Sequence, residues 1–150
     1  MFTVKLFFRR VEGRAVATDT PEGLIVPVVR DADRKSVLDL AREIAAVTEK
    51  ARNRTAALSE VTGSTFTITN YGAFGGYLGT PIINPPEVAI LGLGRAQEKP
   101  VARDGQVVIR SVLPLSLSFD HRLIDGATAQ RFLNAVMARL EDPDLLLIEL

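Results

Sequence analysis

In Leu115-Ser-Leu-Ser-Phe-Asp-His-Arg-Leu-Ile-Asp-Gly126, a strand pattern gives way to a charged turn and then to the start of a helix. Alternation places three apolar side chains on one face of the strand: Leu115, Leu117 and Phe119. Polar and charged residues then dominate residues 120–125. A strand that runs directly into a helix usually projects the intervening side chains beyond the end of a sheet, where functional sites tend to form.

The helix after this turn is predicted over about residues 126–141. Asp125 is placed to cap its first turn, and Pro143 ends it. Its apolar stripe follows helical spacing: Ala129, Phe132, Leu133, Val136, Met137 and Leu140.

An earlier helix of about five turns is predicted to begin after Ser36 and to end before Gly63. Ser36 and Asp39 resemble a capping box in which Asp replaces the usual Glu or Gln. The expected buried face consists of Val37, Leu40, Ala41, Ile44, Ala45 and Thr48.

Six β-type runs accompany the two helices: 14–19, 23–30, 64–69, 87–93, 99–103 and 106–119. Pro27 cannot donate to a ladder, so its run is expected at an edge or a bulge. Asp104-Gly105 predicts a hairpin, since a type I′ turn needs residues that tolerate positive φ. The order predicts one α+β domain over residues 1–150, a two-layer sandwich with a mixed sheet and helices on one side.

Composition excludes several classes of function. Eighteen basic residues balance eighteen acidic ones, which favours neither nucleic acid nor a membrane surface as partner. The 150 residues include no cysteine and one histidine, so neither a Cys nucleophile nor a multi-His metal site is expected. With no long apolar run and no signal-like start, we expect a cytoplasmic protein.

Asp120, His121, Arg122 and Asp125 form the densest cluster of chemically capable side chains. Histidine can accept a proton from a thiol or hydroxyl near neutral pH, and Asp125 could orient the turn. The residues alone leave a second interpretation open, in which the cluster is a solvated, salt-bridged turn that only caps a helix.

Four segments in one order resemble the dihydrolipoamide acyltransferases, the E2 components of 2-oxo acid dehydrogenase complexes, which are relatives of chloramphenicol acetyltransferase. They are residues 23–33, residues 66–72, residues 75–90 and the Asp-His-Arg-x-x-Asp-Gly signature within residues 118–133. The pattern is closest to the pyruvate or branched-chain type. The resemblance begins near residue 13 and leaves residues 1–12 unmatched. It implies a chloramphenicol acetyltransferase-like fold and the last two-thirds of a catalytic domain, and we expect an N-terminally truncated one without lipoyl or subunit-binding domains.

The resemblance implies a role for each matching residue. His121 would deprotonate the thiol of coenzyme A or dihydrolipoamide, Thr69 would donate a hydrogen bond to the oxyanion, and Asp125 would organise the turn. In the family that aspartate pairs with an arginine from the earlier part of the domain, so Asp125 is expected to lack its partner here. Asn70, Gly72 and Gly94 would lie beside the pantetheine arm of coenzyme A.

Partners follow from the same resemblance. Coenzyme A is a substrate and no cofactor is tightly bound, while lipoamide arrives on a separate lipoyl domain. The chain would form a homotrimer within a larger core, with each active site between subunits. Leu145–Ile148 and Leu150 would form contacts between one trimer and the next, or else pack on their own domain. Two rivals remain: an inactive core fragment, and a chloramphenicol-type enzyme with a hydroxyl acceptor, whose motif begins His-His where this chain has Asp120.

Overall fold

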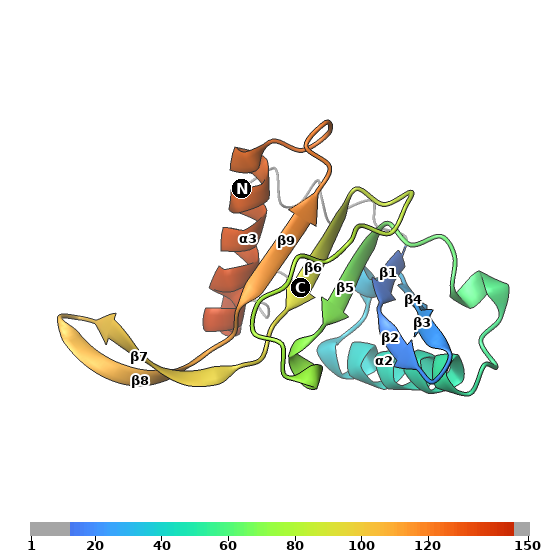
Figure 1. Cartoon of the computed structure of the whole chain (residues 1–150), viewed down its shortest axis with the longest axis horizontal. Helices are drawn as coiled ribbons and strands as arrows, with labels where there is room; N and C mark the ends of the chain where they lie inside the picture. The colour runs from blue at the N-terminus through green and yellow to red at the C-terminus, as the bar shows by residue number, and fades with distance from the viewer. Residues whose placement is uncertain (1–12, 146–150) are drawn as a thin grey trace.

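The computed structural model describes residues 13–145, and its centre is a five-stranded sheet. The strands are β1 (Gly13–Val16), β4 (Val28–Arg30), β5 (Phe66–Asn70), β6 (Ala89–Leu93) and β9 (Leu115–Phe119), in the order β4-β1-β5-β6-β9 (Figure 1). β1, β5 and β6 are mutually parallel, whereas β4 and β9 run antiparallel to their neighbours. The predicted mixed sheet is confirmed.

Two predicted strand runs near the start of the described chain are each divided between two sheets. Residues 14–19 split at Ala17 into β1 and β2 (Thr18–Thr20), and residues 23–30 split before Val28 into β3 (Gly23–Ile25) and β4. β2 and β3 form their own two-stranded sheet. The break falls at Pro27, which has no N–H to donate while its carbonyl accepts from the Val16 N–H at 2.9 Å. β4 is an edge strand, as the proline indicated.

The prediction of one strand over residues 106–119 was wrong. Leu113 and Pro114 separate β8 (Gln106–Val112) from β9, because proline interrupts the ladder. β7 (Gln97–Arg103) and β8 pair only with each other and form a ribbon that projects from the body (Figure 1). Its tip is the predicted Asp104-Gly105 turn, with φ values of 51° and 75°.

Helix α2 (Val37–Arg52) begins where the sequence predicted, but it buries a different face. The Ser36 hydroxyl accepts from the Asp39 N–H at 3.2 Å and donates to the Asp39 carboxylate at 2.6 Å. The reciprocal half of a capping box is absent here, because the shorter Asp side chain binds the hydroxyl instead of the Ser36 N–H. Val47 and Ala51 are the buried residues of the helix. Val37, Ala41, Ile44 and Ala45 of the predicted face are exposed.

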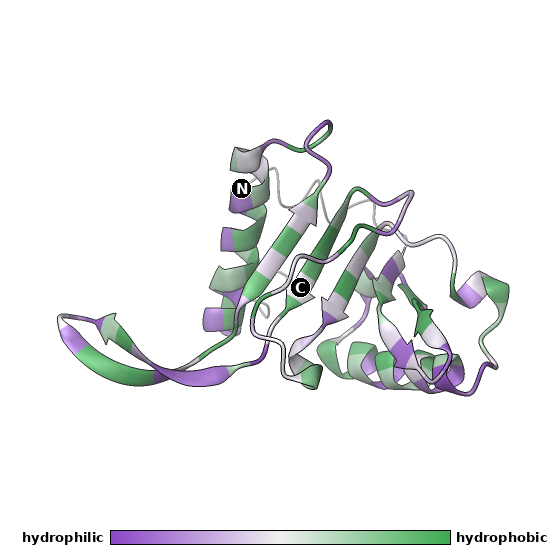
Figure 2. Ribbon diagram, viewed as in Figure 1, coloured by the Kyte–Doolittle hydropathy of each residue, from purple (hydrophilic) through white to green (hydrophobic). Residues whose placement is uncertain are grey.

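Helix α3 (Gly126–Glu141) covers one face of the main sheet. Ala129 is buried, and Phe132 and Leu133 pack on a core that includes Phe66, Leu91 and Ile124. The interior strand β6 is correspondingly largely green in Figure 2. Met137 and Leu140 of the predicted stripe are exposed. Both helices lie behind the strands in Figure 1, which agrees with the expected two-layer arrangement.

Short 3₁₀ turns complete the described fold: η1 (Ala32–Arg34), η2 (Leu58–Glu60) and η3 (Gly72–Phe74). Among residues 13–145, no helix combines the length and apolar character needed to span a bilayer. Residues 1–12, and residues 146–150 with most of the predicted apolar contact segment, lie outside the described part of the chain.

Candidate active site

The turn between β9 and α3 is anchored at both ends. The Asp120 N–H donates to the Val88 carbonyl at 2.8 Å, which extends the sheet contact by one residue. The Leu123 and Ile124 N–H groups both donate to the Asp120 carbonyl at 3.0 Å, and the Ile124 side chain is buried in the core. This fixed turn presents His121 at the end of the sheet.

Asp120 and Arg122 form an ion pair within the turn. Arg122 donates from Nε and from its terminal nitrogen to the Asp120 carboxylate, at 2.9 and 2.6 Å, and its backbone N–H donates to the same group at 3.0 Å. These bonds, the guanidinium first, lower the pKa of Asp120 to about 2. The carboxylate beside His121 is therefore charged and already engaged by Arg122.

His121 is exposed to solvent, and its ring stacks obliquely on Phe119, with the ring centroids 5.5 Å apart and the planes at 39°. Within the described residues, no hydrogen bond or ion pair involves the imidazole. An exposed imidazole held by one aromatic contact is accessible to an incoming acidic proton.

Asp125 caps α3, as the sequence predicted. Its carboxylate accepts from the Thr128 N–H at 2.7 Å and from the Thr128 hydroxyl at 3.0 Å. These bonds lower the pKa of Asp125, with a smaller contribution from the charge of Arg131. In the part of the chain from residue 13 to residue 145, Asp125 forms no ion pair with an arginine, and its hydrogen-bond partner is Thr128 in the first turn of α3.

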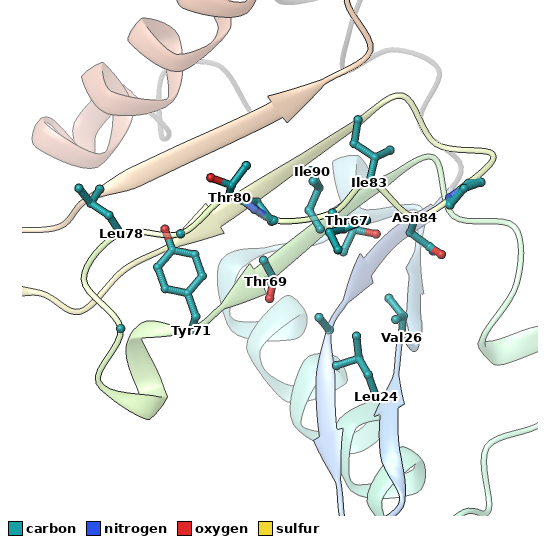
Figure 3. A pocket seen from close by; sticks show the side chains of 16 residues that line it. Leu24, Val26, Thr67, Thr69, Tyr71, Leu78, Thr80, Ile83, Asn84 and Ile90 are labelled. Atoms are coloured by element: carbon teal, nitrogen blue, oxygen red, sulfur yellow. The ribbon is translucent and has the colours of Figure 1, made fainter.

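Thr69 lies on the opposite face of the sheet from α3, in a pocket of about 620 Å³ (Figure 3). Thr67, Thr69 and Ile90 form its floor from β5 and β6. Leu24 and Val26 border it from the β3 segment, and the loop over residues 78–85 forms its roof. The pocket is apolar apart from a few hydroxyl and amide groups, a composition typical of small-molecule sites.

Gly72 and Gly94 are needed for close backbone packing. An added Cβ at Gly72 would lie 2.3 Å from the Gly94 carbonyl, and one at Gly94 would lie 2.1 Å from the Tyr77 carbonyl. Arg95 donates its N–H to the Gly76 carbonyl at 2.8 Å. The glycine-rich segment is therefore tied to the end of β6. Asn70 accepts from the Ala73 N–H at 3.1 Å and so stabilises the same turn.

Thr69 and His121 are not brought together within one chain. The registers place Thr69 in a row with Gly92 and Ser116, whereas His121 follows Phe119, which pairs with Ala89 at the other end of β6. At about 3.3 Å per residue, the three positions from Ser116 to Phe119 span about 10 Å along β9, and His121 lies beyond the end of that strand. Within one chain, the Thr69 hydroxyl and the His121 imidazole therefore lie at opposite ends of the sheet.

Two polar pairs were missed by sequence reasoning. The Tyr71 hydroxyl donates to Ser116 Oγ at 3.0 Å, and the Thr67 hydroxyl donates to the buried Glu87 carboxylate at 2.6 Å. Each joins one strand residue to a residue just outside another strand: Ser116 of β9 to Tyr71 after β5, and Thr67 of β5 to Glu87 before β6. No local pattern could reveal them, although Thr67 and Tyr71 do share the strand alternation of Thr69.

The chain belongs to the acyltransferase catalytic domain family of the 2-oxoacid dehydrogenases, which it matches over residues 14–148. Among curated proteins, it is 55% identical over 134 residues to the dihydrolipoyllysine-residue acetyltransferase component of the Bacillus subtilis pyruvate dehydrogenase complex. The corresponding protein of Staphylococcus epidermidis is 52% identical. Each match covers 89% of this chain, which spans 30% and 31% of the two relatives.

Solved structures agree with this assignment. The dihydrolipoamide acetyltransferase of Azotobacter vinelandii, in which a serine, a histidine and an asparagine were investigated in the catalytic mechanism, matches with a TM-score of 0.88 and 47% identity. That match covers 92% of this chain and 57% of the other. The truncated catalytic core of the 2-oxoacid dehydrogenase multienzyme complex from Thermoplasma acidophilum matches at 0.77 and 48%, covering 89% and 59%. The expected chloramphenicol acetyltransferase-like fold is confirmed.

Proposed function

We propose that this chain transfers an acyl group between dihydrolipoamide and coenzyme A, with His121 as the base and Thr69 as the oxyanion donor. One observation carries the proposal: the chain has an exposed imidazole at one end of the sheet and a hydroxyl in an apolar pocket at the other end. Repeated copies could then combine the two groups at each contact between chains.

The spacing of the three residues supports their roles. In the Azotobacter protein the investigated serine precedes the histidine by 52 residues, and the asparagine follows it by four. Thr69, His121 and Asp125 have the same spacing in this chain. Two of the three side chains differ. Thr69 replaces serine and still has a hydroxyl, and Asp125 replaces asparagine and still has a side-chain oxygen, which here accepts from the Thr128 N–H.

The proposed reaction is attack of a thiol on an acyl thioester, with one proton passed through His121. A free thiol has a pKa of about 8.5, so little of it is thiolate at neutral pH and a base beside it accelerates attack. The His121 imidazole takes the thiol proton, and the new thiolate attacks the carbonyl carbon of the acyl thioester. The Thr69 hydroxyl donates to the resulting oxyanion. Collapse breaks the original C–S bond, and the departing thiolate recovers the proton from the imidazolium.

We also propose that copies of the chain assemble as a trimer within a larger core. The β7–β8 ribbon supports this idea, because one of its faces carries apolar side chains that are largely exposed, with Val107 and Ile109 at 77% and 62%. An isolated two-stranded ribbon is marginally stable in water, so a covering partner would favour its folding. The ribbon leaves the sheet at the Thr69 end, where the His121 turn of another copy would have to lie.

We propose two substrates that bring the reacting thiols to this chain. Coenzyme A and an acylated lipoyl domain would supply the two thiols, with no tightly bound cofactor. A cytoplasmic location is the expectation from the sequence.

An exchange assay tests the proposed activity. Purified chain is mixed with acetyl coenzyme A and dihydrolipoamide, and the S-acetyldihydrolipoamide formed is separated from acetyl coenzyme A by chromatography and quantified. His121→Ala should abolish transfer without changing the oligomer, and Gln130→Ala serves as an exposed control in α3, since the Gln130 side chain bonds only to Asn134 among the described residues. Assembly without transfer would favour the inactive core fragment, and transfer to chloramphenicol instead of a thiol would favour the hydroxyl-acceptor enzyme. Normal transfer by His121→Ala would refute the mechanism.

A further inference from the structure

The Tyr71 ring is enclosed by three glycines from two different parts of the chain. A Cβ added at Gly92 of β6 would lie 2.7 Å from Tyr71 Cε1. Cβ atoms added at Gly76 and Gly79 would lie 3.0 and 3.1 Å from carbons of the same ring. The ring therefore packs directly against the backbone of β6 and of the loop, and a Cβ at Gly92 would force the ring to shift.

The phenol oxygen fixes the ring in a second way. Tyr71 comes just after β5 and donates its hydroxyl to Ser116 Oγ of β9 at 3.0 Å. Ser116 pairs with Gly92, which pairs with Thr69. The side chain thus spans the sheet from β5, across the glycine of β6, to β9, in the row that contains Thr69.

Tyr71 and Thr69 line the same pocket, and in Figure 3 the ring stands beside Thr69 below the roof loop. Gly76 and Gly79 belong to both the pocket lining and the ring contacts. The ring consequently forms one wall of the pocket and supports part of its roof. Tyr77 differs, since it lies outside the pocket lining and its ring is covered by the Lys99 ammonium at 3.8 Å.

We propose that Tyr71 is a positioning residue that sets the size of the acyl group admitted beside Thr69. The inference rests on the proposed acyl transfer and assigns specificity to that site. A rigid wall held by a hydrogen bond and by backbone contacts excludes extra methyl groups more effectively than a mobile side chain, because it cannot move aside cheaply.

Acyl selectivity provides the first test. The kcat/KM values for isobutyryl and acetyl coenzyme A are measured with dihydrolipoamide as acceptor. Tyr71→Ala should raise the isobutyryl to acetyl ratio by about tenfold or more, the scale on which pockets discriminate single methylene groups. Tyr71→Phe keeps the ring and should restore most of the wild-type ratio, and the control Tyr77→Ala should leave the ratio unchanged. An unchanged ratio in Tyr71→Ala, or an equal change in Tyr77→Ala, would overturn the proposal.

Tyrosine emission provides a second test that does not depend on turnover. The chain has two tyrosines and no tryptophan, so Tyr77→Phe leaves Tyr71 as the emitter and Tyr71→Phe leaves Tyr77. Titration with S-acetyldihydrolipoamide should change the emission of Tyr77→Phe and not that of Tyr71→Phe. A titration without any change in Tyr77→Phe contradicts a wall role for Tyr71. If the wild type shows no acyl transfer but the emission of Tyr77→Phe changes on titration, the result counts against the proposed function and not against the position of Tyr71 in the pocket wall.

Discussion

Replacing Gly94 by alanine would place a methyl carbon 2.1 Å from the Tyr77 carbonyl oxygen and 3.2 Å from Cβ of Pro114. The first contact involves backbone, so the loop must retreat from the end of β6 by about 1 Å to reach an ordinary separation. Because Gly76 and Gly79 follow Gly72 in that loop, the displacement would also move the pocket roof.

The expected cost follows from the overpacking of a filled site. Such substitutions typically cost about 1–3 kcal/mol. For a chain of this size, each kcal/mol lowers Tm by about 2–4 °C, so Gly94→Ala should lower Tm by about 2–12 °C. Gly126→Ala is the matched control, because an added Cβ there meets nothing within 4 Å. It should leave Tm unchanged or slightly raised, since alanine is the better helix former.

Thermal unfolding followed by circular dichroism at fixed protein concentration checks this prediction, with acetyl exchange measured on the same samples. An unchanged Tm in Gly94→Ala would refute the packing argument. If KM for coenzyme A rose at the same time, Gly94 would act as a ligand contact, as the family resemblance implies, and not as a site of close backbone packing.

Three further predictions concern other parts of the molecule. Thr69→Val should lower kcat for acetyl exchange about a hundredfold, the usual effect of losing one oxyanion donor, whereas Thr69→Ser should stay near wild type; equal rates in both would contradict the assigned role. Because the folded pKa of Asp120 is depressed, its stabilising contribution should be complete above the ordinary value of 3.8 and disappear as pH falls towards 2. Asp120→Asn should therefore flatten the acid side of a Tm-against-pH curve, and an unaltered curve would count against the Arg122 pairing. Ile109→Glu should weaken self-association in analytical ultracentrifugation without lowering monomer helicity, and unaffected assembly would rule out the ribbon as an interface.

Local signals predicted the elements that local physics determines. Asp125 at the start of α3, Ser36 at the start of α2 and Asp104-Gly105 at the ribbon tip all lie where capping and turn preferences indicated. Each depends on hydrogen bonds or backbone angles within a few residues. The His121 turn was identified in the same way, since its residues are contiguous.

Features set by long-range packing could not be predicted. The face that α2 buries depends on where β2 and β4 lie, and apolar residues on two sides of the helix made the periodicity ambiguous. Pro114 divides a run whose composition is strand-like throughout. The Tyr71 wall needs contacts between residues 71, 92 and 116, and no spacing rule relates those positions. The separation of Thr69 from His121 likewise emerges only from the strand registers.

In the proposed enzyme, one active site uses the Thr69 hydroxyl of one copy and the His121 imidazole of another. Mixing Thr69→Val and His121→Ala chains by joint unfolding and refolding tests this arrangement directly. In a closed ring with random assortment, about one quarter of the contacts would combine an intact Thr69 with an intact His121. We expect the mixture to recover about a quarter of wild-type acetyl exchange from two nearly inactive parents. A mixture no more active than the mean of its parents would contradict it.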